Sequence, residues 1–175
     1  MSDSRGTEER SWAPWLVAVV AGVVFVAGII VYYAPLGHAR GNSGVGDFSS
    51  SEKAAMTAAA VETANLLTYS RAHFDSDYER AVKGTTGQLK TDVASKKSAT
   101  KSTLTKGKFD LTARVTHQAL VGPSGKGGKS YDVLISINGY KSTTPDVPTQ
   151  QNLQVTVTKV GGTWLASNVQ SSAVS

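Results

Sequence analysis

Residues 111–119 read Leu-Thr-Ala-Arg-Val-Thr-His-Gln-Ala, with an apolar side chain or a histidine at every second position. The same alternation recurs in residues 133–137 and in residues 153–157. A period of two is typical of a β-strand that packs one face and exposes the other. The segment 123–128, Pro-Ser-Gly-Lys-Gly-Gly, and the pair Gly161-Gly162 read as turns between such strands. We therefore predict a curved antiparallel sheet of about four strands.

Helical patterns precede these strands. Ser49-x-x-Glu52 is a capping box that opens an Ala-rich helix, expected to run to about residue 70. Ser76-x-x-Glu79 has the same spacing and predicts a short helix ending near residue 83, and residues 86–104 read as a third, weakly amphipathic helix. Helices followed by a strand meander indicate the α+β class. We expect one domain over residues 49–175, in which about three helices pack on the curved sheet. The sheet is expected to wrap around the first helix.

A long apolar run lies near the start of the chain. No charged residue occurs between Arg10 and Arg40, and residues 15–34 are almost wholly apolar. Twenty residues in a helix span about 30 Å, the thickness of the bilayer core. We interpret residues 12–35 as one transmembrane helix between a cytoplasmic tail, 1–11, and a linker, 36–48. This interpretation excludes a fully soluble protein, and the lack of a second such run excludes a multi-pass transporter.

A cleaved signal peptide is the rival interpretation, with Gly37-His38-Ala39 as the cleavage site. Its apolar core would be about 7–15 residues, which is shorter than this run, so an uncleaved anchor is favoured. Arg5 and Arg10 in the short first segment favour a cytoplasmic N-terminus. We therefore predict a single-pass plasma-membrane protein whose C-terminal domain is extracytoplasmic, in the periplasm or cell envelope.

Small residues mark one side of the expected membrane helix. Ala18 and Gly22 form a small-xxx-small pair, and Gly28 follows further along. Small side chains let a second helix approach closely in lipid, although Ala and Gly are common in any membrane helix. These three residues are the candidates for packing against a partner helix.

The extramembrane part is basic. Residues 40–175 hold 16 Lys and Arg against 10 Asp and Glu, a net charge of +6. The candidate contacts for a protein partner or for anionic lipid are four lysines of the third expected helix: Lys90, Lys96, Lys97 and Lys101. A solvated helix face explains the same lysines. Nucleic acid is disfavoured as a partner because no aromatic stacking platform accompanies them.

Few residues of the chain are candidates for catalysis or ligand binding. The chain has no Cys, which excludes thiol nucleophiles and Cys-ligated zinc. Alternation predicts that His117 points inward and Asp132 outward, and Tyr69 is expected near the opening of the domain, so Tyr69 and His117 are the pocket candidates.

One further cluster combines metal-ligand types. His73, Asp75 and Asp77 would suit a metal, but acidic residues in a first helical turn are explained by capping and by the helix dipole. We expect no catalytic residue, no metal and no cofactor.

Four features of the chain resemble the Mce-associated membrane proteins, the single-pass accessory proteins of Mce-type lipid importers. A lone anchor directly precedes a short linker. The Ala-rich helix ends in Leu-Leu-Thr-Tyr-Ser at 66–70, and 74–80, Phe-Asp-Ser-Asp-Tyr-Glu-Arg, is similar to the family's turn into a second helix. Residues 157–165, Val-Thr-Lys-Val-Gly-Gly-Thr-Trp-Leu, resemble its closing hairpin.

This resemblance implies an NTF2-like (SnoaL-like) cone and a role that is not enzymatic. It implies an accessory or stabilising subunit of a complex that imports a lipid such as a fatty acid or a sterol. Its partners would be the permease and the Mce-domain subunits. Two other classes stay open: a membrane-anchored carrier or sensor of a hydrophobic ligand, and a degenerate enzyme of the cone type.

Overall fold

The computed structural model describes residues 48–125 and 127–172. The expected tail, membrane helix and linker therefore lie outside the described residues, except for Phe48 at the linker's end. The helix-packing candidates Ala18, Gly22 and Gly28 also lie outside them. Among the helices that are described, none combines the length and the apolarity needed to cross a membrane.

The first helix, α2, spans Ser50–Leu67 and confirms the predicted capping box. The Ser49 hydroxyl accepts from the Glu52 backbone N–H at 3.3 Å, and the Glu52 carboxylate accepts from the Ser49 backbone N–H at 2.8 Å. These two hydrogen bonds satisfy backbone donors that a helix start otherwise leaves unpaired. The Ser49 hydroxyl also donates to the Glu52 carboxylate at 2.8 Å, and this bond, followed by the one from the Ser49 backbone N–H, lowers the pKa of Glu52.

The second helix, α3, spans Phe74–Lys83, so its predicted start at Ser76 is wrong by two residues. His73 occupies the cap position without a side-chain hydrogen bond, and the Ser76 hydroxyl donates to the His73 carbonyl. The helix begins earlier because Phe74 is buried in the core, which is a tertiary reason rather than a capping one. Its end at Lys83, followed by Gly84, is confirmed.

The single helix predicted over residues 86–104 is two helices, α4 (Gly87–Ser95) and α5 (Lys97–Gly107). The break falls at Lys96, whose backbone N–H donates to the Val93 carbonyl, three residues back. Apolar periodicity did not reveal the break, because Ser95, Lys96 and Lys97 are all polar and fit one continuous helix as well as two separate ones.

The sheet is a four-stranded antiparallel meander in the order β1-β2-β3-β4, as predicted. Its strands are β1 (Leu111–Pro123), β2 (Ser130–Lys141), β3 (Thr144–Val160) and β4 (Thr163–Ser171). β3 begins nine residues before the alternation at Leu153, because residues 144–150 are exposed on both faces and therefore show no alternation of apolar and polar side chains. Gly161 and Gly162 join β3 to β4 with φ of 56° and 91°, which the primed hairpin turn requires.

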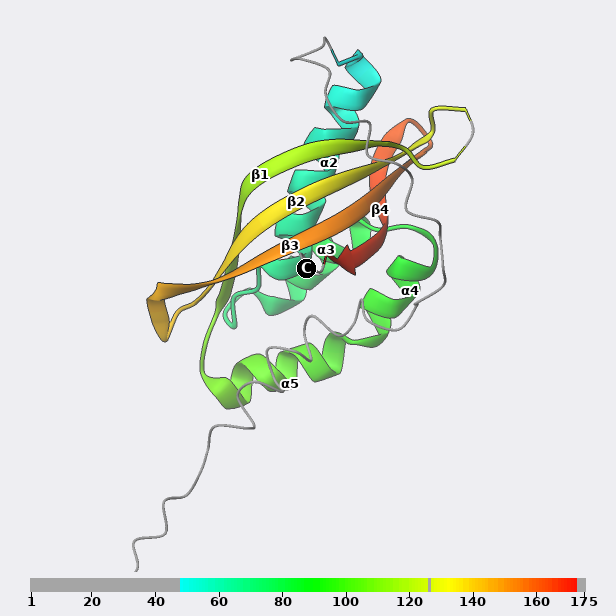
Figure 1. Cartoon of the computed structure of the whole chain (residues 1–175). Helices are drawn as coiled ribbons and strands as arrows, with labels where there is room; N and C mark the ends of the chain where they lie inside the picture. Colours follow the sequence, from blue (N-terminus) through cyan, green and yellow to red (C-terminus); the bar gives the residue numbers. More distant parts are fainter. Residues whose placement is uncertain (1–47, 126, 173–175) are drawn as a thin grey trace, which may run out of the picture.

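One face of the sheet packs against α2 around a single hydrophobic core. Figure 1 shows the strands crossing over α2 on one side of it, with α3, α4 and α5 grouped at the lower part of the domain. Ala55 and Ala59 of α2 are fully buried, and their small side chains let the helix lie close to the sheet. The most deeply buried large side chains are all in this core: Leu104, Val133, Ile135, Val155 and Val157.

Candidate functional site

In a carrier of a hydrophobic ligand, residues such as Leu66, Val115 and Ile135 would line the binding pocket. In this domain they instead belong to the hydrophobic core or pack against it. Ile135 is buried within the core, and Leu66 and Val115 are partly buried against it. A bound hydrophobic ligand would have to displace these contacts, because protein interiors are packed at about the density of organic crystals.

Tyr69 lies inside this core rather than across an opening. Its ring is tilted against those of Phe74 and Tyr78, with centroids 5.9 and 5.8 Å away, and Phe74 and Tyr78 lie 5.3 Å apart. Burial raises the pKa of the Tyr69 phenol, with a smaller contribution from Tyr78, so the phenol stays protonated. The Tyr78 hydroxyl donates to the Val93 carbonyl, which joins α3 to α4.

The predicted inward direction of His117 is wrong. A β-bulge at Thr116 shifts the register, so that Val115 opposes the buried Ile137 whereas His117 opposes Ser136. The extra residue moves the following side chains to the other face of the sheet, and His117 is exposed there. The structure therefore does not bring His117 together with the buried Tyr69. Asp132 does face outward as predicted, where its carboxylate accepts from the Thr156 hydroxyl at 2.6 Å.

The cluster between α2 and α3 is used for ion pairing and backbone capping. Asp77 is nearly buried, accepts from the Ser70 backbone N–H at 2.8 Å and pairs with Arg80 at 3.0 Å. Asp75 instead points toward α5, and His73 is exposed. Over the described ranges, no three His, Asp or Glu side chains are grouped as ligands of a metal ion.

Two of the four candidate lysines form ion pairs between helices of the domain. Lys97 and Lys101 of α5 each approach the Asp75 carboxylate of α3 at 2.9 Å, and the Lys101 ammonium also lies over the Phe74 ring. We call Lys97, Lys101 and Asp75 the α5 clip. Lys90 and Lys96, by contrast, are exposed and take part in no ion pair within the described residues.

The α5 clip should weaken in acid. Hydrogen bonds from Lys101 and then Lys97 hold the pKa of Asp75 below its ordinary 3.8. A carboxylate with a lowered pKa stabilises the fold above the unfolded-state pKa and loses that contribution as the pH falls through the folded-state value. Asp75→Asn should therefore slightly lower the protection of α5 amides from hydrogen exchange at pH 7 and have a smaller effect at a pH well below 3.8, where the carboxyl group of the wild type becomes protonated. An effect of equal size at both pH values would contradict this ionic account.

A second group of cations comes together from four separate segments. The Arg71 guanidinium and backbone N–H both donate to the Asp110 carboxylate, at 3.0 and 2.8 Å, and lower its pKa, the backbone bond contributing most. Lys141 lies over the Phe109 ring at 5.2 Å, and Arg114 lies over the Tyr140 ring at 5.3 Å. Lys108 caps α5 directly before Phe109, and Lys106 lies in the last turn of the same helix. The distal corner, as we name it, consists of Arg71, Lys106, Lys108, Arg114 and Lys141.

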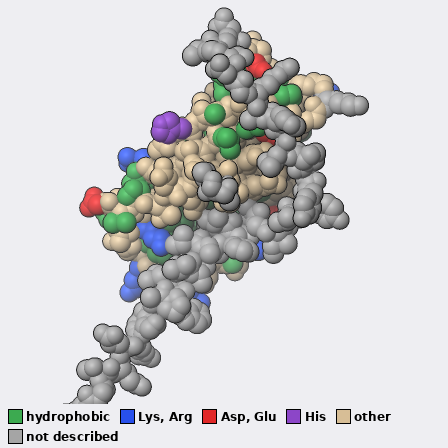
Figure 2. All heavy atoms as spheres, in the orientation of Figure 1, with side chains coloured by type: hydrophobic (Ala, Val, Ile, Leu, Met, Phe, Trp, Pro, Cys, Tyr) green, Lys and Arg blue, Asp and Glu red, His purple; other side chains and the backbone are tan. Residues whose placement is uncertain are grey.

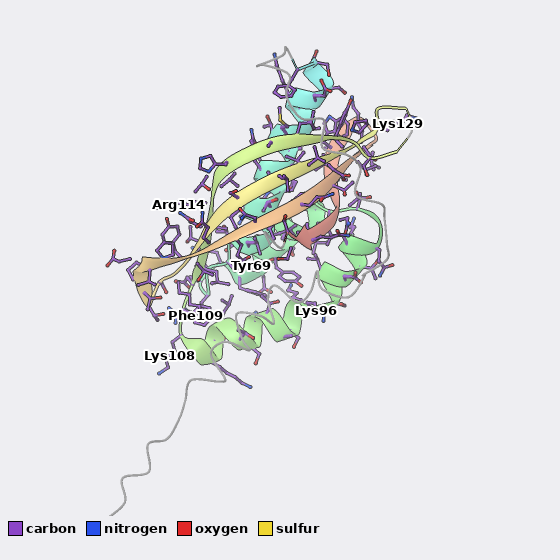
Figure 3. The ribbon with its side chains drawn as sticks, viewed as in Figure 1. Tyr69, Lys96, Lys108, Phe109, Arg114 and Lys129 are labelled. Atoms are coloured by element: carbon purple, nitrogen blue, oxygen red, sulfur yellow. The ribbon has the colours of Figure 1, made fainter. Side chains whose placement is uncertain are left out.

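Figure 3 shows Lys108, Phe109 and Arg114 at one end of the domain and Lys129 at the other. Sequence reasoning missed the corner because it looked for lysines along one segment. Antiparallel pairing of Leu111 with Lys141 and of Thr112 with Tyr140 creates the corner. Only the alternation that predicted the hairpin pointed to this pairing.

The outer face of the sheet is polar and largely uncharged. Its hydroxyl and amide side chains bond to one another across the strands, as Ser130 does with Thr158 and Ser136 with Asn152. In the view of Figure 2, few charged side chains lie over the strands that the grey atoms leave uncovered. This face therefore offers hydrogen bonds and little charge to a partner.

No protein-family model matches the chain, and no curated protein sequence matches it. Its backbone is similar to solved structures. A periplasmic fragment of TraM has 16% identity and a TM-score of 0.58, with 70% of this chain and 98% of that chain covered. The periplasmic domain of DotI has 17% identity and a TM-score of 0.57, with 74% and 100% covered. The described domain has an α+β fold of four helices and a four-stranded antiparallel sheet, and this fold is similar to those of the two periplasmic domains.

A third solved structure with this fold is an IcmL-like type IV secretion system protein from Legionella pneumophila. It has 16% identity and a TM-score of 0.53, with 74% of this chain and 96% of that chain covered. At these identities the likeness concerns the fold alone. The described domain of this chain thus shares its architecture with two periplasmic domains and a secretion-system protein.

Proposed function

We propose that this chain is a non-catalytic accessory subunit that stabilises a multi-protein complex of the cell envelope. Residues 12–35 anchor it in the plasma membrane, and the NTF2-like domain lies on the extracytoplasmic side, as in the periplasmic domains of TraM and DotI. The observation that carries the proposal is the packed interior of the cone, in which Leu66, Val115 and Ile135 belong to or pack against the core. The polar groups that remain for function are on the surface, where they suit docking.

The specific complex we propose is an Mce-type lipid importer that carries a fatty acid or a sterol. This finer proposal rests on the order and spacing of the four sequence features described above. The domain docks on the permease and the Mce-domain subunits, binds no cofactor, and leaves ATP hydrolysis to a separate cytoplasmic subunit.

The test is purification of the tagged full-length chain from native membranes in mild detergent, with the co-purifying proteins identified by mass spectrometry. Recovery of a permease, an ATPase and Mce-domain subunits in a fixed ratio supports the proposal. Recovery of secretion-system subunits keeps the accessory role and replaces the Mce assignment. Recovery of the chain alone at high yield overturns the accessory role and favours the carrier of a hydrophobic ligand.

The anchor gives a separate prediction. Ala18→Leu combined with Gly22→Leu adds apolar volume, so the chain should still insert, but close helix packing should be blocked. We expect recovery of the permease to fall roughly fivefold, the effect of about 1 kcal/mol of helix association. Val19→Leu with Val23→Leu, on a neighbouring side of the same helix, is the matched control. Equal recovery for both double variants would move the contact to the NTF2-like domain.

A further inference from the structure

The distal corner lies at the end of the domain opposite to the point where the chain enters it. The chain enters at Ser49, and α2 then runs for 18 residues, which is about 27 Å. Just beyond its end, Tyr69 and Leu111 exchange backbone hydrogen bonds of 2.9 Å, so the start of β1 lies against the far end of α2. In the anchored chain proposed above, the tether joins the domain at Ser49, at the end opposite to the corner.

The corner carries more positive charge than its own carboxylates can balance. Asp110 is paired with Arg71, and Asp146 is exposed in the adjoining hairpin. The other four cations of the corner form no ion pair within the part of the chain that the structure describes. Stacking on Tyr140 holds the Arg114 guanidinium in place, and a held guanidinium binds a carboxylate with little loss of conformational freedom.

The backbone conformation of Lys108 is a further indication that the corner has a binding role. This residue caps α5 in the left-handed conformation, with φ of 52°, where glycine is the favoured residue. It is the single residue other than glycine with positive φ among those described. A lysine at this position lowers the stability of the cap relative to glycine, and the charge that it adds to the corner offers a reason for its presence.

An exposed hairpin that carries one large apolar side chain, Val147, lies beside the corner. The hairpin between β2 and β3 extends past the rest of the sheet (Figure 1), and all of residues 142–150 are exposed. Ser142 fixes its base, because its hydroxyl accepts from the Asp110 N–H at 2.8 Å and its own N–H donates to the Asp110 carbonyl at 3.0 Å. Val147 on this hairpin is 69% exposed. An apolar side chain next to charged groups is the usual composition of a protein interface.

From these observations we propose that the distal corner and the adjoining hairpin bind an acidic surface of another protein subunit in the envelope. The proposal rests on the proposed function, because the anchor of that function joins the domain at the end opposite to the corner. Lipid headgroups of the chain's own membrane are the less favoured partner for the same reason. Nucleic acid is disfavoured because Lys141 and Arg114 already cover the aromatic faces of Phe109 and Tyr140.

The test uses the full-length chain in native membranes, with the photo-crosslinking residue p-benzoylphenylalanine at Thr144 in the hairpin. We expect a discrete protein adduct whose cross-linked peptide, identified by mass spectrometry, is rich in Asp and Glu. Lys108→Glu with Arg114→Glu should reduce its yield about tenfold through charge repulsion. Lys53→Glu with Lys129→Glu makes the same change of charge at other exposed positions and should reduce it less than twofold.

The Lys108→Gly variant removes the charge of this residue without destabilising the fold, so it distinguishes an effect of charge from an effect of folding. Glycine suits the left-handed cap, so this variant should unfold at an equal or higher temperature and still give about threefold less adduct. A lipid adduct, a cross-linked peptide without an acidic cluster, or a yield unaffected by the corner variants would overturn the inference. The complex recovered by the tagged chain would then remain intact, whereas failure of the proposed function would leave the wild-type chain without co-purifying subunits.

Discussion

Phe74→Ala should lower the free energy of unfolding by about 3–5 kcal/mol, the usual effect of removing a buried ring. Phe74 is one of three rings of the aromatic cluster that all contact one another, and it is 3% exposed. Its removal leaves a cavity between α3 and the chain at the end of α2, and it also removes the surface on which Lys101 rests. Urea unfolding of the full-length protein in mild detergent, followed by tryptophan fluorescence, measures the change.

Phe74→Leu is the matched control because it keeps most of the apolar volume and removes the ring. It should cost about 1–2 kcal/mol, which combines the lost ring–ring interactions with a small change of shape. If both variants were equally unstable, ring geometry rather than buried volume would be the main contribution of Phe74. A loss below 1 kcal/mol for Phe74→Ala would contradict the packing described above.

Leu104→Ala should have the second largest effect, about 2–3 kcal/mol, and the effect should be concentrated in one helix. Leu104 is the only buried residue of α5, at 1% exposure. The rest of α5 is mainly Lys, Ser and Thr, its start has no side-chain cap, and an 11-residue helix is marginal by itself in water. Hydrogen exchange should therefore show loss of protection in α5 while the strands of the sheet stay protected.

Leu134→Ala provides the comparison, since Leu134 is on the outer face of β2 and is 39% exposed. The same chemical change there should alter stability by less than about 1 kcal/mol and leave α5 protected. Loss of protection across the whole sheet in Leu104→Ala would indicate that α5 is part of the cooperative core rather than a helix held by one side chain and the α5 clip.

Local patterns were sufficient wherever neighbouring residues in the chain supply the interaction. The capping box of α2 and the glycine turn between β3 and β4 both formed as predicted, because their hydrogen bonds and dihedral angles involve residues within three positions. Alternation in β2 predicted its buried face and the outward direction of Asp132 for the same reason. The α+β class and the strand order follow from these local elements and their short connections.

Other features depend on contacts between distant segments. Burial of Phe74 moved the start of α3, and the bulge at Thr116 reversed the direction of His117, because one inserted residue changes the parity of every position after it. The distal corner exists because strand pairing places residues 30 positions apart side by side, as it does for Leu111 and Lys141. Hydrophobic period and capping chemistry therefore specified which elements form, whereas register and packing, which depend on the whole fold, determined which side chains meet at its surface.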